Sequence, residues 1–276
     1  MKLIEGGKIF QKIFGRVAKS IGRSKITPGL AVVLVGDDPA SEIYVRLKKK
    51  SAKKIGVEFI LHKFKAQEHE EKILKKIALL NNNPKIHGII VQLPLPKKFN
   101  TQKIINAVDP RKDVDGFHPE NIQRFLNEKF FCWPVFPRAI VEMIKSTRKN
   151  VKSKKAIVIA NSDMFGKIMS EALRKIGMQA EYILSKNADK YIGHIQKADV
   201  VVTAMGKPKF LKGDVFKDGA IIIDGGISKR GKKVFGDVDI QSIQNKDVII
   251  SPVPGGVGSV TIACLLENLY KLSGKK

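Results

Sequence analysis

The sequence has 276 residues, which is enough for one large domain or two of ordinary size, each with a hydrophobic core. No apolar run reaches the ~18 residues of a membrane span, the N-terminus has no signal-peptide pattern, and two cysteines make no disulfide framework. The five histidines show no metal-ligand spacing. We therefore expect a cytoplasmic protein with no membrane partner and no structural metal.

The charge is strongly basic, with 51 basic and 26 acidic residues and a formal net charge of +25. Such a field attracts polyanions, including nucleic acids. However, the basic residues are mostly lysines, are spread along the whole chain, and accompany no nucleic-acid-binding signature. Lysine enrichment on solvated faces explains the charge equally well, so nucleic acid is not expected as the main partner. A basic nucleic-acid-binding module stays open as an alternative.

The first half of the chain alternates between helical and strand patterns. Apolar residues at helical spacing predict a helix over 8–22, and a continuous apolar run predicts a buried parallel strand over 30–35. A helix from Pro39 to about Gly56, a strand over 57–64, a helix over 68–80 and a strand over 87–91 follow. This order predicts an α/β domain with a mainly parallel sheet.

The helix that starts at Pro39 carries a candidate for proton chemistry. Asp38 can cap it and Pro39 suits its first turn. Tyr44 and Lys48 then stand at i and i+4 on one face, while Ile43 and Leu47 are expected to face the core. A lysine amine acts as a base when burial or neighbouring cations lower its pKa. The alternative is that Lys48 is one of several solvated lysines.

Two further segments carry candidate polar residues, and the first is placed near this helix by the rule that ligands bind beyond the carboxyl ends of parallel strands. The segment from Gln92 to Pro96 follows a strand, so we expect Gln92 near Tyr44 and Lys48. Asp113 and Asp115 lie in a turn-rich segment that has too few oxygen ligands for a calcium loop. A plain turn is the alternative interpretation of this segment.

The second half of the chain repeats the α/β pattern. Helices are expected over 138–147, from the 161–166 segment through Ile176, and over 260–272. Strands are expected over 155–160, 180–184, 199–204, 220–224 and 248–250. The pattern predicts a doubly wound unit in the style of dinucleotide-binding domains, although the G-x-G-x-x-G fingerprint is absent. Segment 251–261, with two prolines and three glycines before a helix, indicates a ligand-facing loop, with a bare hinge as the alternative.

Six spaced motifs run through nearly the whole chain, and together they resemble the bifunctional methylenetetrahydrofolate dehydrogenase/methenyltetrahydrofolate cyclohydrolase family. The motifs are Tyr44-x-x-x-Lys48, Val91-Gln-Leu-Pro-Leu-Pro96, Lys112-Asp-Val-Asp-Gly116, Met205-Gly-Lys-Pro208, Gly219-Ala-Ile-Ile-Ile-Asp224 and Pro252-Val-Pro-Gly-Gly-Val-Gly258. The resemblance implies two α/β domains with a folate cleft between them. The catalytic domain would span 1–136 with a returning helix over 259–276, and a Rossmann-like NAD(P)-binding domain would span 137–258.

The resemblance also implies which residues act. The matches to the family's active site are Tyr44, Lys48, Gln92 and Asp115. Folate would also be lined by Leu93, Pro254, Gly255, Gly256 and Val257. The cofactor would be held by Ala160, Asn161, Ser162, Gly166, Ser185, Lys186, Gly206 and Ile227, of which Ser185 and Lys186 lie where a doubly wound domain usually contacts the ribose.

The implied activity is oxidation of 5,10-methylenetetrahydrofolate with NAD(P)⁺, followed by hydrolysis of the methenyl product to 10-formyltetrahydrofolate. The resemblance also implies a homodimer and tetrahydrofolate derivatives as partners. The sequence departs from the family pattern where Ala160 and Asn161 replace a usual Gly and frequent Arg, and also at Phe136, Ile168 and Ser259. We expect NADP retained through Lys186, with NAD as the alternative cofactor. An enzyme that keeps only the cyclohydrolase activity is a second alternative.

Overall fold

The computed structural model describes residues 1–130, 132–231 and 233–274. These residues form two compact units. One consists of residues 12–135 and 262–276 and is called the three-stranded unit; the other consists of residues 1–11 and 136–261 and is called the six-stranded unit. The N-terminal residues join the second unit because β1 (Lys2–Leu3) pairs in parallel with β11 (Ile249–Ser251). A two-residue strand carries no periodicity, so the sequence did not predict it.

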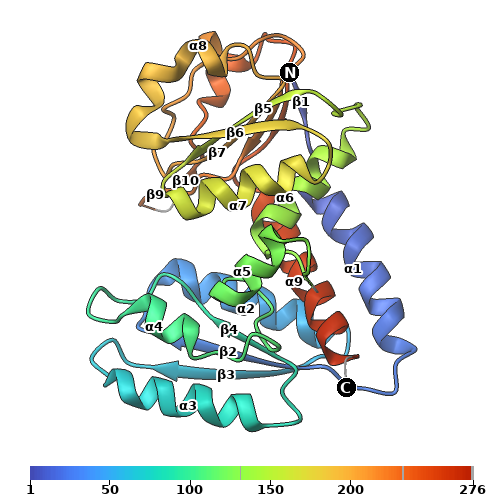
Figure 1. Cartoon of the computed structure of the whole chain (residues 1–276), viewed down its shortest axis with the longest axis vertical. Helices are drawn as coiled ribbons and strands as arrows, with labels where there is room; N and C mark the ends of the chain where they lie inside the picture. Colours follow the sequence, from blue (N-terminus) through green and yellow to red (C-terminus); the bar gives the residue numbers. More distant parts are fainter. Residues whose placement is uncertain (131, 232, 275–276) are drawn as a thin grey trace. The chain divides into compact units, whose positions relative to one another are not determined.

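The three-stranded unit is built on a parallel sheet of order β3-β2-β4. Its strands are β2 (Gly29–Val35), β3 (Glu58–Phe64) and β4 (Gly88–Val91), connected by α2 (Pro39–Lys54) and α3 (Glu70–Asn82). All seven residues of β2 are buried, as its continuous apolar run predicts. The two connecting helices cover opposite faces of the sheet (Figure 1). The core joins β2 to Ile73, Ile77 and Leu80 of α3.

Helix α2 buries a different face from the one that the sequence predicts. Ile43 and Leu47 are 44% and 46% exposed, so the expectation that they face the core is wrong. Ser41, Val45 and Ala52 are buried instead. The large apolar residues of this helix alternate at 43, 45 and 47, so they mark no single helical face. Packing against the sheet selects Val45.

The six-stranded unit contains a parallel sheet of order β1-β11-β8-β7-β5-β6. Its other strands are β5 (Lys155–Ala160), β6 (Gln179–Leu184), β7 (Val200–Ala204) and β8 (Ile221–Asp224). Helix α7 (Asp163–Arg174) covers one face, and the 3₁₀ segment η1 (Ser185–Tyr191) and α8 (Ile192–Ile195) cover the other (Figure 1). The direction in which strands are added reverses at β5: β6 pairs with one side of β5, and the next strand, β7, pairs with the other side. This confirms the predicted doubly wound arrangement.

Two long helices and several short elements complete the two units. Helix α1 (Gly6–Gly22) and helix α9 (Val257–Ser273) were predicted, with ends that differ by a few residues. The sequence did not predict α4 (Thr101–Asn106), α5 (Pro119–Leu126), the 3₁₀ turn η3 (Ile240–Ile243), or the hairpin of β9 (Ser228–Arg230) and β10 (Lys233–Phe235). The 3₁₀ turn η2 (Gly213–Val215) lies between β7 and β8. Helix α6 (Val135–Ser146) starts three residues before its predicted start. Such short segments span too few turns or alternations to give a clear period.

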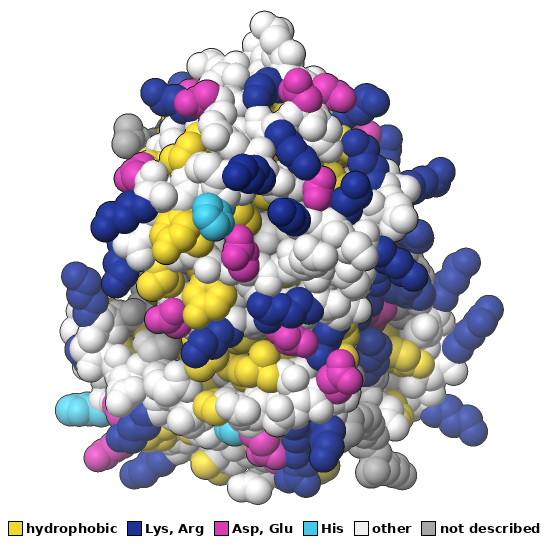
Figure 2. Space-filling view, turned by 45° about the horizontal axis from the view of Figure 1, so that its top comes forward, with side chains coloured by type: hydrophobic (Ala, Val, Ile, Leu, Met, Phe, Trp, Pro, Cys, Tyr) yellow, Lys and Arg dark blue, Asp and Glu magenta, His cyan; other side chains and the backbone are white. Residues whose placement is uncertain are grey.

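The surface carries the basic charge in a dispersed form. Figure 2 shows lysine and arginine side chains scattered over the visible face, with acidic side chains among them. In the part of the chain that the structure describes, no helix is both long and apolar enough to cross a membrane.

Candidate functional site

Helix α2 starts where the sequence predicts, and this start sets the position of Tyr44 and Lys48. Asp38 Oδ2 accepts a hydrogen bond of 2.7 Å from the Ser41 N–H, and Pro39 occupies the first turn. Tyr44 and Lys48 follow on one helical face, and both are half-buried. Neither side chain therefore belongs to the core or to the fully solvated lysine surface.

Lys48 contacts Gln92, which lies directly after β4. Lys48 Nζ donates a 3.0 Å hydrogen bond to Gln92 Oε1. Gln92 is itself fixed, because its backbone N–H donates to Val33 O at 2.9 Å and its Nε2 donates to Leu93 O at 2.8 Å. The expected proximity of Gln92 and Lys48 is confirmed, since β2 and β4 are neighbours and α2 leaves the carboxyl end of β2.

Asp113 and Asp115 have different surroundings although they are two residues apart. The buried Asp113 carboxylate accepts hydrogen bonds from Gly116 N at 3.0 Å, His118 N at 2.8 Å and Asn121 Nδ2 at 3.0 Å. Asp113 therefore shapes the turn. The Ile89 N–H donates to Lys112 O at 2.7 Å and draws the segment against β4. The half-buried Asp115 carboxylate takes no part in these hydrogen bonds of the turn.

The electrostatics link Asp115 to Lys48. Burial raises the pKa of the Asp115 carboxyl; the positive charge of Lys48 opposes this rise, and the negative charge of Asp113 adds to it. Burial also raises the pKa of the Tyr44 phenol. The three-stranded unit therefore brings together an amine, an amide, a phenol and a carboxyl group in a partly desolvated place.

Asn268 of α9 supports this group, although no sequence pattern predicts it. Its buried side-chain Nδ2 donates to Val114 O at 3.0 Å and to Trp133 O at 2.9 Å. Both carbonyls flank the Asp115 segment. An asparagine within a helix that lies more than a hundred residues further along the chain has no local pattern that would reveal this role.

In the six-stranded unit, the predicted cofactor residues begin at the junction of β5 and α7. Ala160 is buried at the end of β5, and Asn161 and Ser162 are exposed. Ser162 caps α7 by accepting a 3.4 Å hydrogen bond from the Phe165 N–H. A Cβ at Gly166 would lie 2.3 Å from Tyr182 Cδ2, so a glycine is required there. The Tyr182 hydroxyl donates to Asp163 Oδ1 at 3.1 Å and holds its ring over this first turn.

The remaining predicted cofactor residues follow the carboxyl ends of β6, β7 and β8. Ser185 and the exposed Lys186 open η1 after β6, and Lys207 Nζ donates to Ser185 O at 3.0 Å. Gly206 has a φ of +69° after β7, and Ile227 is 48% exposed after β8. A helix N-terminus and several loops at one end of a parallel sheet fit the phosphates and rings of a dinucleotide.

The proline-glycine loop after β11 carries the other predicted folate residues. The Val253–Pro254 peptide is cis and Gly255 has a φ of +100°. A Cβ at Gly256 would lie 2.5 Å from Pro252 O. The structure thus places Pro254, Gly255, Gly256 and Val257 in the six-stranded unit, whereas Tyr44, Lys48, Gln92, Leu93 and Asp115 lie in the three-stranded unit.

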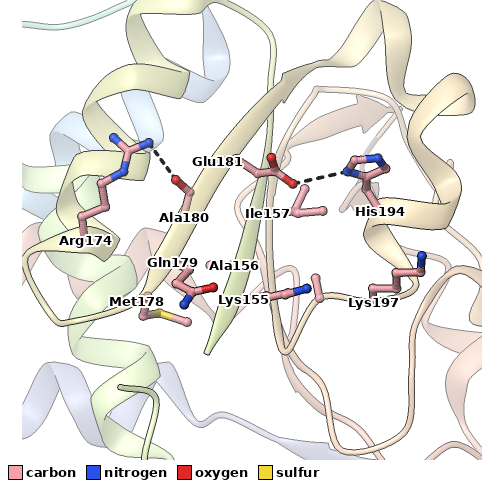
Figure 3. Close-up of a pocket in the computed structure, with 11 residues that line it drawn as sticks. Lys155, Ala156, Ile157, Arg174, Met178, Gln179, Ala180, Glu181, His194 and Lys197 are labelled. Atoms are coloured by element: carbon pink, nitrogen blue, oxygen red, sulfur yellow. Dashed lines mark hydrogen bonds and ion pairs between the residues drawn. The ribbon is translucent and has the colours of Figure 1, made fainter. Parts of the chain in front are cut away.

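A hollow of about 660 Å³ in the six-stranded unit contains none of these residues. It lies at the amino ends of β5 and β6, where Lys155, Gln179 and Ala198 line it (Figure 3). Arg174 donates to Ala180 O at 2.7 Å and His194 Nδ1 lies 3.4 Å from Glu181 Oε1, so polar groups of this hollow contact one another. No group of three His, Cys, Asp or Glu side chains suited to a metal ion occurs within residues 1–130, 132–231 and 233–274.

Comparison with known proteins agrees with this geometry. The family model "Tetrahydrofolate dehydrogenase/cyclohydrolase, catalytic domain" matches residues 4–115, and the model for the NAD(P)-binding domain of that family matches residues 134–276. The Bifunctional protein FolD of Nautilia profundicola is 40% identical over 275 residues, covering 98% of this chain and 96% of that protein.

Solved structures of relatives have the same fold. The bifunctional enzyme FolD of Campylobacter jejuni superposes with a TM-score of 0.92 at 33% identity, covering 99% of this chain and 98% of that one. The Trypanosoma brucei enzyme, determined with NADP cofactor and an inhibitor, gives a TM-score of 0.89 at 27% identity, covering 97% and 94%. This chain therefore belongs to the tetrahydrofolate dehydrogenase/cyclohydrolase family of bifunctional enzymes.

Proposed function

We propose that this enzyme uses Lys48, Tyr44, Gln92 and Asp115 to oxidise 5,10-methylenetetrahydrofolate to the methenyl cation and to hydrolyse that cation to 10-formyltetrahydrofolate. The observation that carries the proposal is the 3.0 Å contact between Lys48 Nζ and Gln92 Oε1, in a place where the Lys48 charge also acts on Asp115. Four polar groups of different chemistry converge there.

The hydrolytic step needs a base. Water adds to the methenyl carbon and loses one proton. The bond from this carbon to one ring nitrogen then breaks, that nitrogen takes up the hydroxyl proton, and the formyl group stays on the other nitrogen. An unprotonated lysine amine can accept the proton of the attacking water. Gln92 orients Lys48 through its amide oxygen, because its own backbone and Nε2 are already hydrogen-bonded. Asp115 would accept a hydrogen bond from the amino edge of the pterin, and Leu93 would contact the folate.

The oxidative step requires orientation and exclusion of water more than a base. The nicotinamide cofactor, when bound, accepts the hydride. In our proposal Ser162 and the N-terminus of α7 hold its phosphates with Ala160 and Asn161, while Gly206 and Ile227 flank the rings. The requirement for a glycine at 166 and the exposure of Asn161, Ser162 and Ile227 support this placement. We assign 1–136 with 259–276 to folate chemistry and 137–258 to cofactor binding, except that residues 1–11 pack in the six-stranded unit through β1.

For the cofactor we propose NADP. Asn161 offers a neutral amide where an arginine is frequent, so the 2′-phosphate needs another cation. Lys186 is exposed at the end of β6, and Lys207 is tied to the same place by its bond to Ser185 O. The relative from Trypanosoma brucei was determined with NADP. Lys186→Ala should lower the NADP-to-NAD ratio of kcat/KM about tenfold, while the exposed Lys190→Ala should leave it unchanged; an unaltered ratio in Lys186→Ala contradicts this assignment.

We also propose a homodimer. Strand β3 is an edge of its sheet, and Leu61 on it is 38% exposed. Ile43 and Leu47 of the neighbouring α2 are exposed as well. An open strand edge beside apolar side chains favours association with a second copy. Light scattering of the parent and of Leu61→Lys measures the molar mass of each in solution, and a monomeric parent contradicts the proposal.

A spectrophotometric assay tests the function as a whole. Oxidation of methylenetetrahydrofolate is followed with each nicotinamide cofactor, and decay of methenyltetrahydrofolate is followed separately without cofactor. We expect both activities in the purified protein. Loss of the first activity with retention of the second would identify a single-activity cyclohydrolase, and absence of both would contradict the proposal.

A further inference from the structure

Two buried carboxylates in the six-stranded unit are not used by the proposed chemistry. Asp224 ends β8 and is 3% exposed, and Asp237 follows β10 and is fully buried. Burying a carboxylate costs free energy unless it is well hydrogen-bonded. Two such groups beside each other therefore need a structural or functional reason.

Asp237 holds the turn that follows β7. Its Oδ2 accepts hydrogen bonds from the Thr203 hydroxyl at 2.6 Å and from the Met205 N–H at 2.7 Å, and its Oδ1 accepts one from the Lys207 N–H at 2.8 Å. These donors lie before, within and at the end of the turn that contains Gly206. One side chain thus fixes the backbone on both sides of Gly206.

Asp224 does the same for the neighbouring turn. Its Oδ1 accepts from Gly226 N at 3.0 Å and from Asp237 N at 3.1 Å, and its Oδ2 accepts from Val238 N at 2.9 Å. Gly226 precedes Ile227, the residue assigned to the nicotinamide. Asp224 therefore connects the Ile227 turn to the segment that carries Asp237.

The glycines of this region are explained by the two carboxylates. A Cβ at Gly226 would lie 2.1 Å from Asp237 Cγ, and a Cβ at Gly236 would lie 2.0 Å from Asp224 Oδ2. The Asp237 side chain therefore packs against the backbone of Gly226, close to Asp224, and the Asp224 side chain packs against the backbone of Gly236, next to Asp237. The two turns and the two side chains form one interlocked unit at the carboxyl end of the sheet.

We propose that Asp224 and Asp237 are positioning residues for cofactor binding, which hold the Gly206 and Ile227 turns in the conformation that receives the nicotinamide end. This inference rests on the proposed function, because that function assigns Gly206 and Ile227 to the cofactor. Neither carboxylate would touch the reacting atoms. Both oxygens of each carboxylate already accept hydrogen bonds from the chain.

The test is Asp237→Asn in the full-length protein. Asparagine has the shape of aspartate, but its amide replaces one acceptor oxygen with an NH₂ group. That group would face a backbone N–H or a hydroxyl that now donates to Asp237. We expect the KM for NADP in the dehydrogenase reaction and its dissociation constant by calorimetry to rise at least tenfold. Hydrolysis of methenyltetrahydrofolate, measured without cofactor, should stay within twofold of the parent. Hydrogen exchange of peptides covering 203–207 and 225–227 should accelerate in the cofactor-free variant.

Asp199→Asn is the matched control. Asp199 also accepts from a backbone N–H, that of Lys155 at 2.8 Å, but it lies at the amino end of the sheet. The Asp199→Asn substitution should leave the KM and the dissociation constant for NADP unchanged, even if it lowers the melting temperature. Equal NADP affinity in the parent and Asp237→Asn overturns the positioning role. A parent that binds neither NADP nor NAD instead overturns the proposed function on which this inference rests.

Discussion

At the scale of single residues, the proposed role of Lys48 depends on how this residue differs from the lysines around it. Lys49 and Lys50 are exposed on the same helix, whereas Lys48 is half-buried and hydrogen-bonded to Gln92. The amine is thus held in one place by a group that is held in place itself. Fixed geometry of this kind distinguishes a catalytic lysine from a solvated one.

Lys48→Met should abolish hydrolysis of methenyltetrahydrofolate, because methionine keeps the length of the side chain but cannot accept a proton. Hydride transfer should fall less, since orientation carries that step. Both rates are measured by absorbance on the purified protein. Lys49→Met is the control and should behave as the parent. A Lys48→Met protein that hydrolyses the methenyl compound at the parent rate would show that Lys48 is not the base.

Asp115→Ala should weaken folate binding. A hydrogen bond to a charged carboxylate contributes roughly 1.5–3 kcal/mol, which corresponds to about a tenfold to hundredfold loss of affinity. Calorimetric titration with a folate analogue measures the dissociation constant. Asp113→Ala provides the contrast, because that carboxylate holds the turn, and its loss should lower the free energy of unfolding. An unchanged dissociation constant in Asp115→Ala would show that Asp115 does not bind folate and that both aspartates are only turn residues.

At the scale of elements, the contact of α7 with β6 positions the start of the proposed cofactor site. Gly166 lets the helix approach the Tyr182 ring, and the Tyr182 hydroxyl bonds to Asp163 in the first turn. Strand β6 therefore holds the N-terminal turn of α7 in place through Tyr182. The departure at Ile168 fits the same packing, because this residue is buried within an unbroken helix.

Gly166→Ala should destabilise the protein by about 1–3 kcal/mol, because the added methyl overlaps the Tyr182 ring. The intrinsic helix preference of alanine, about 1 kcal/mol over glycine, acts in the opposite direction. Gly15→Ala in α1, where a Cβ meets nothing within 4 Å, isolates that preference and should be neutral or stabilising. Urea unfolding of both variants decides between the effects, and a Gly166→Ala protein as stable as Gly15→Ala contradicts the prediction.

At the scale of the whole molecule, Asp224 should make stability depend on pH. Burial raises the pKa of Asp224 to about 7, although three backbone N–H groups lower it and Asp237 raises it further. The folded protein therefore binds this proton more tightly than the unfolded chain, whose aspartates titrate near ~3.9. The contribution to the free energy of unfolding is fully present below pH ~4 and is lost as the pH rises to about 7.

The measurement is urea unfolding of the parent and of Asp224→Asn between pH 4 and 8. Relative to the variant, the parent should lose roughly 1.4 kcal/mol per pH unit up to about pH 7. In Asp199, burial raises the carboxyl pKa, but hydrogen bonds from Lys217 and the Lys155 backbone lower it more. Asp199→Asn should therefore leave the slope in this window unchanged. Parallel curves for the parent and Asp224→Asn contradict the prediction.

Much of the architecture was determined by the sequence alone. Continuous apolar runs such as 30–35 and 155–160 indicate buried parallel strands, and their alternation with helical periods restricts the topology to doubly wound sheets. The start of α2 followed from Asp38 and Pro39, because capping depends on neighbouring residues. The proximity of Lys48 to Gln92 also followed, since Gln92 comes directly after β4 and Lys48 lies on α2, which leaves the carboxyl end of the neighbouring β2.

Tertiary structure decided what depends on contacts distant in sequence. The sequence could not select Val45 over Ile43 and Leu47 as the buried residue of α2, because the partner surface makes that choice. The resemblance singled out Asp115, but the residue pattern alone could not separate Asp113 from Asp115, since the contacts of Gly116, His118 and Asn121 assign the turn to Asp113. The same holds for Asn268 and for the Asp224–Asp237 pair. Hydrogen bonds between remote segments leave no period in the sequence, and only the folded chain brings their donors and acceptors together.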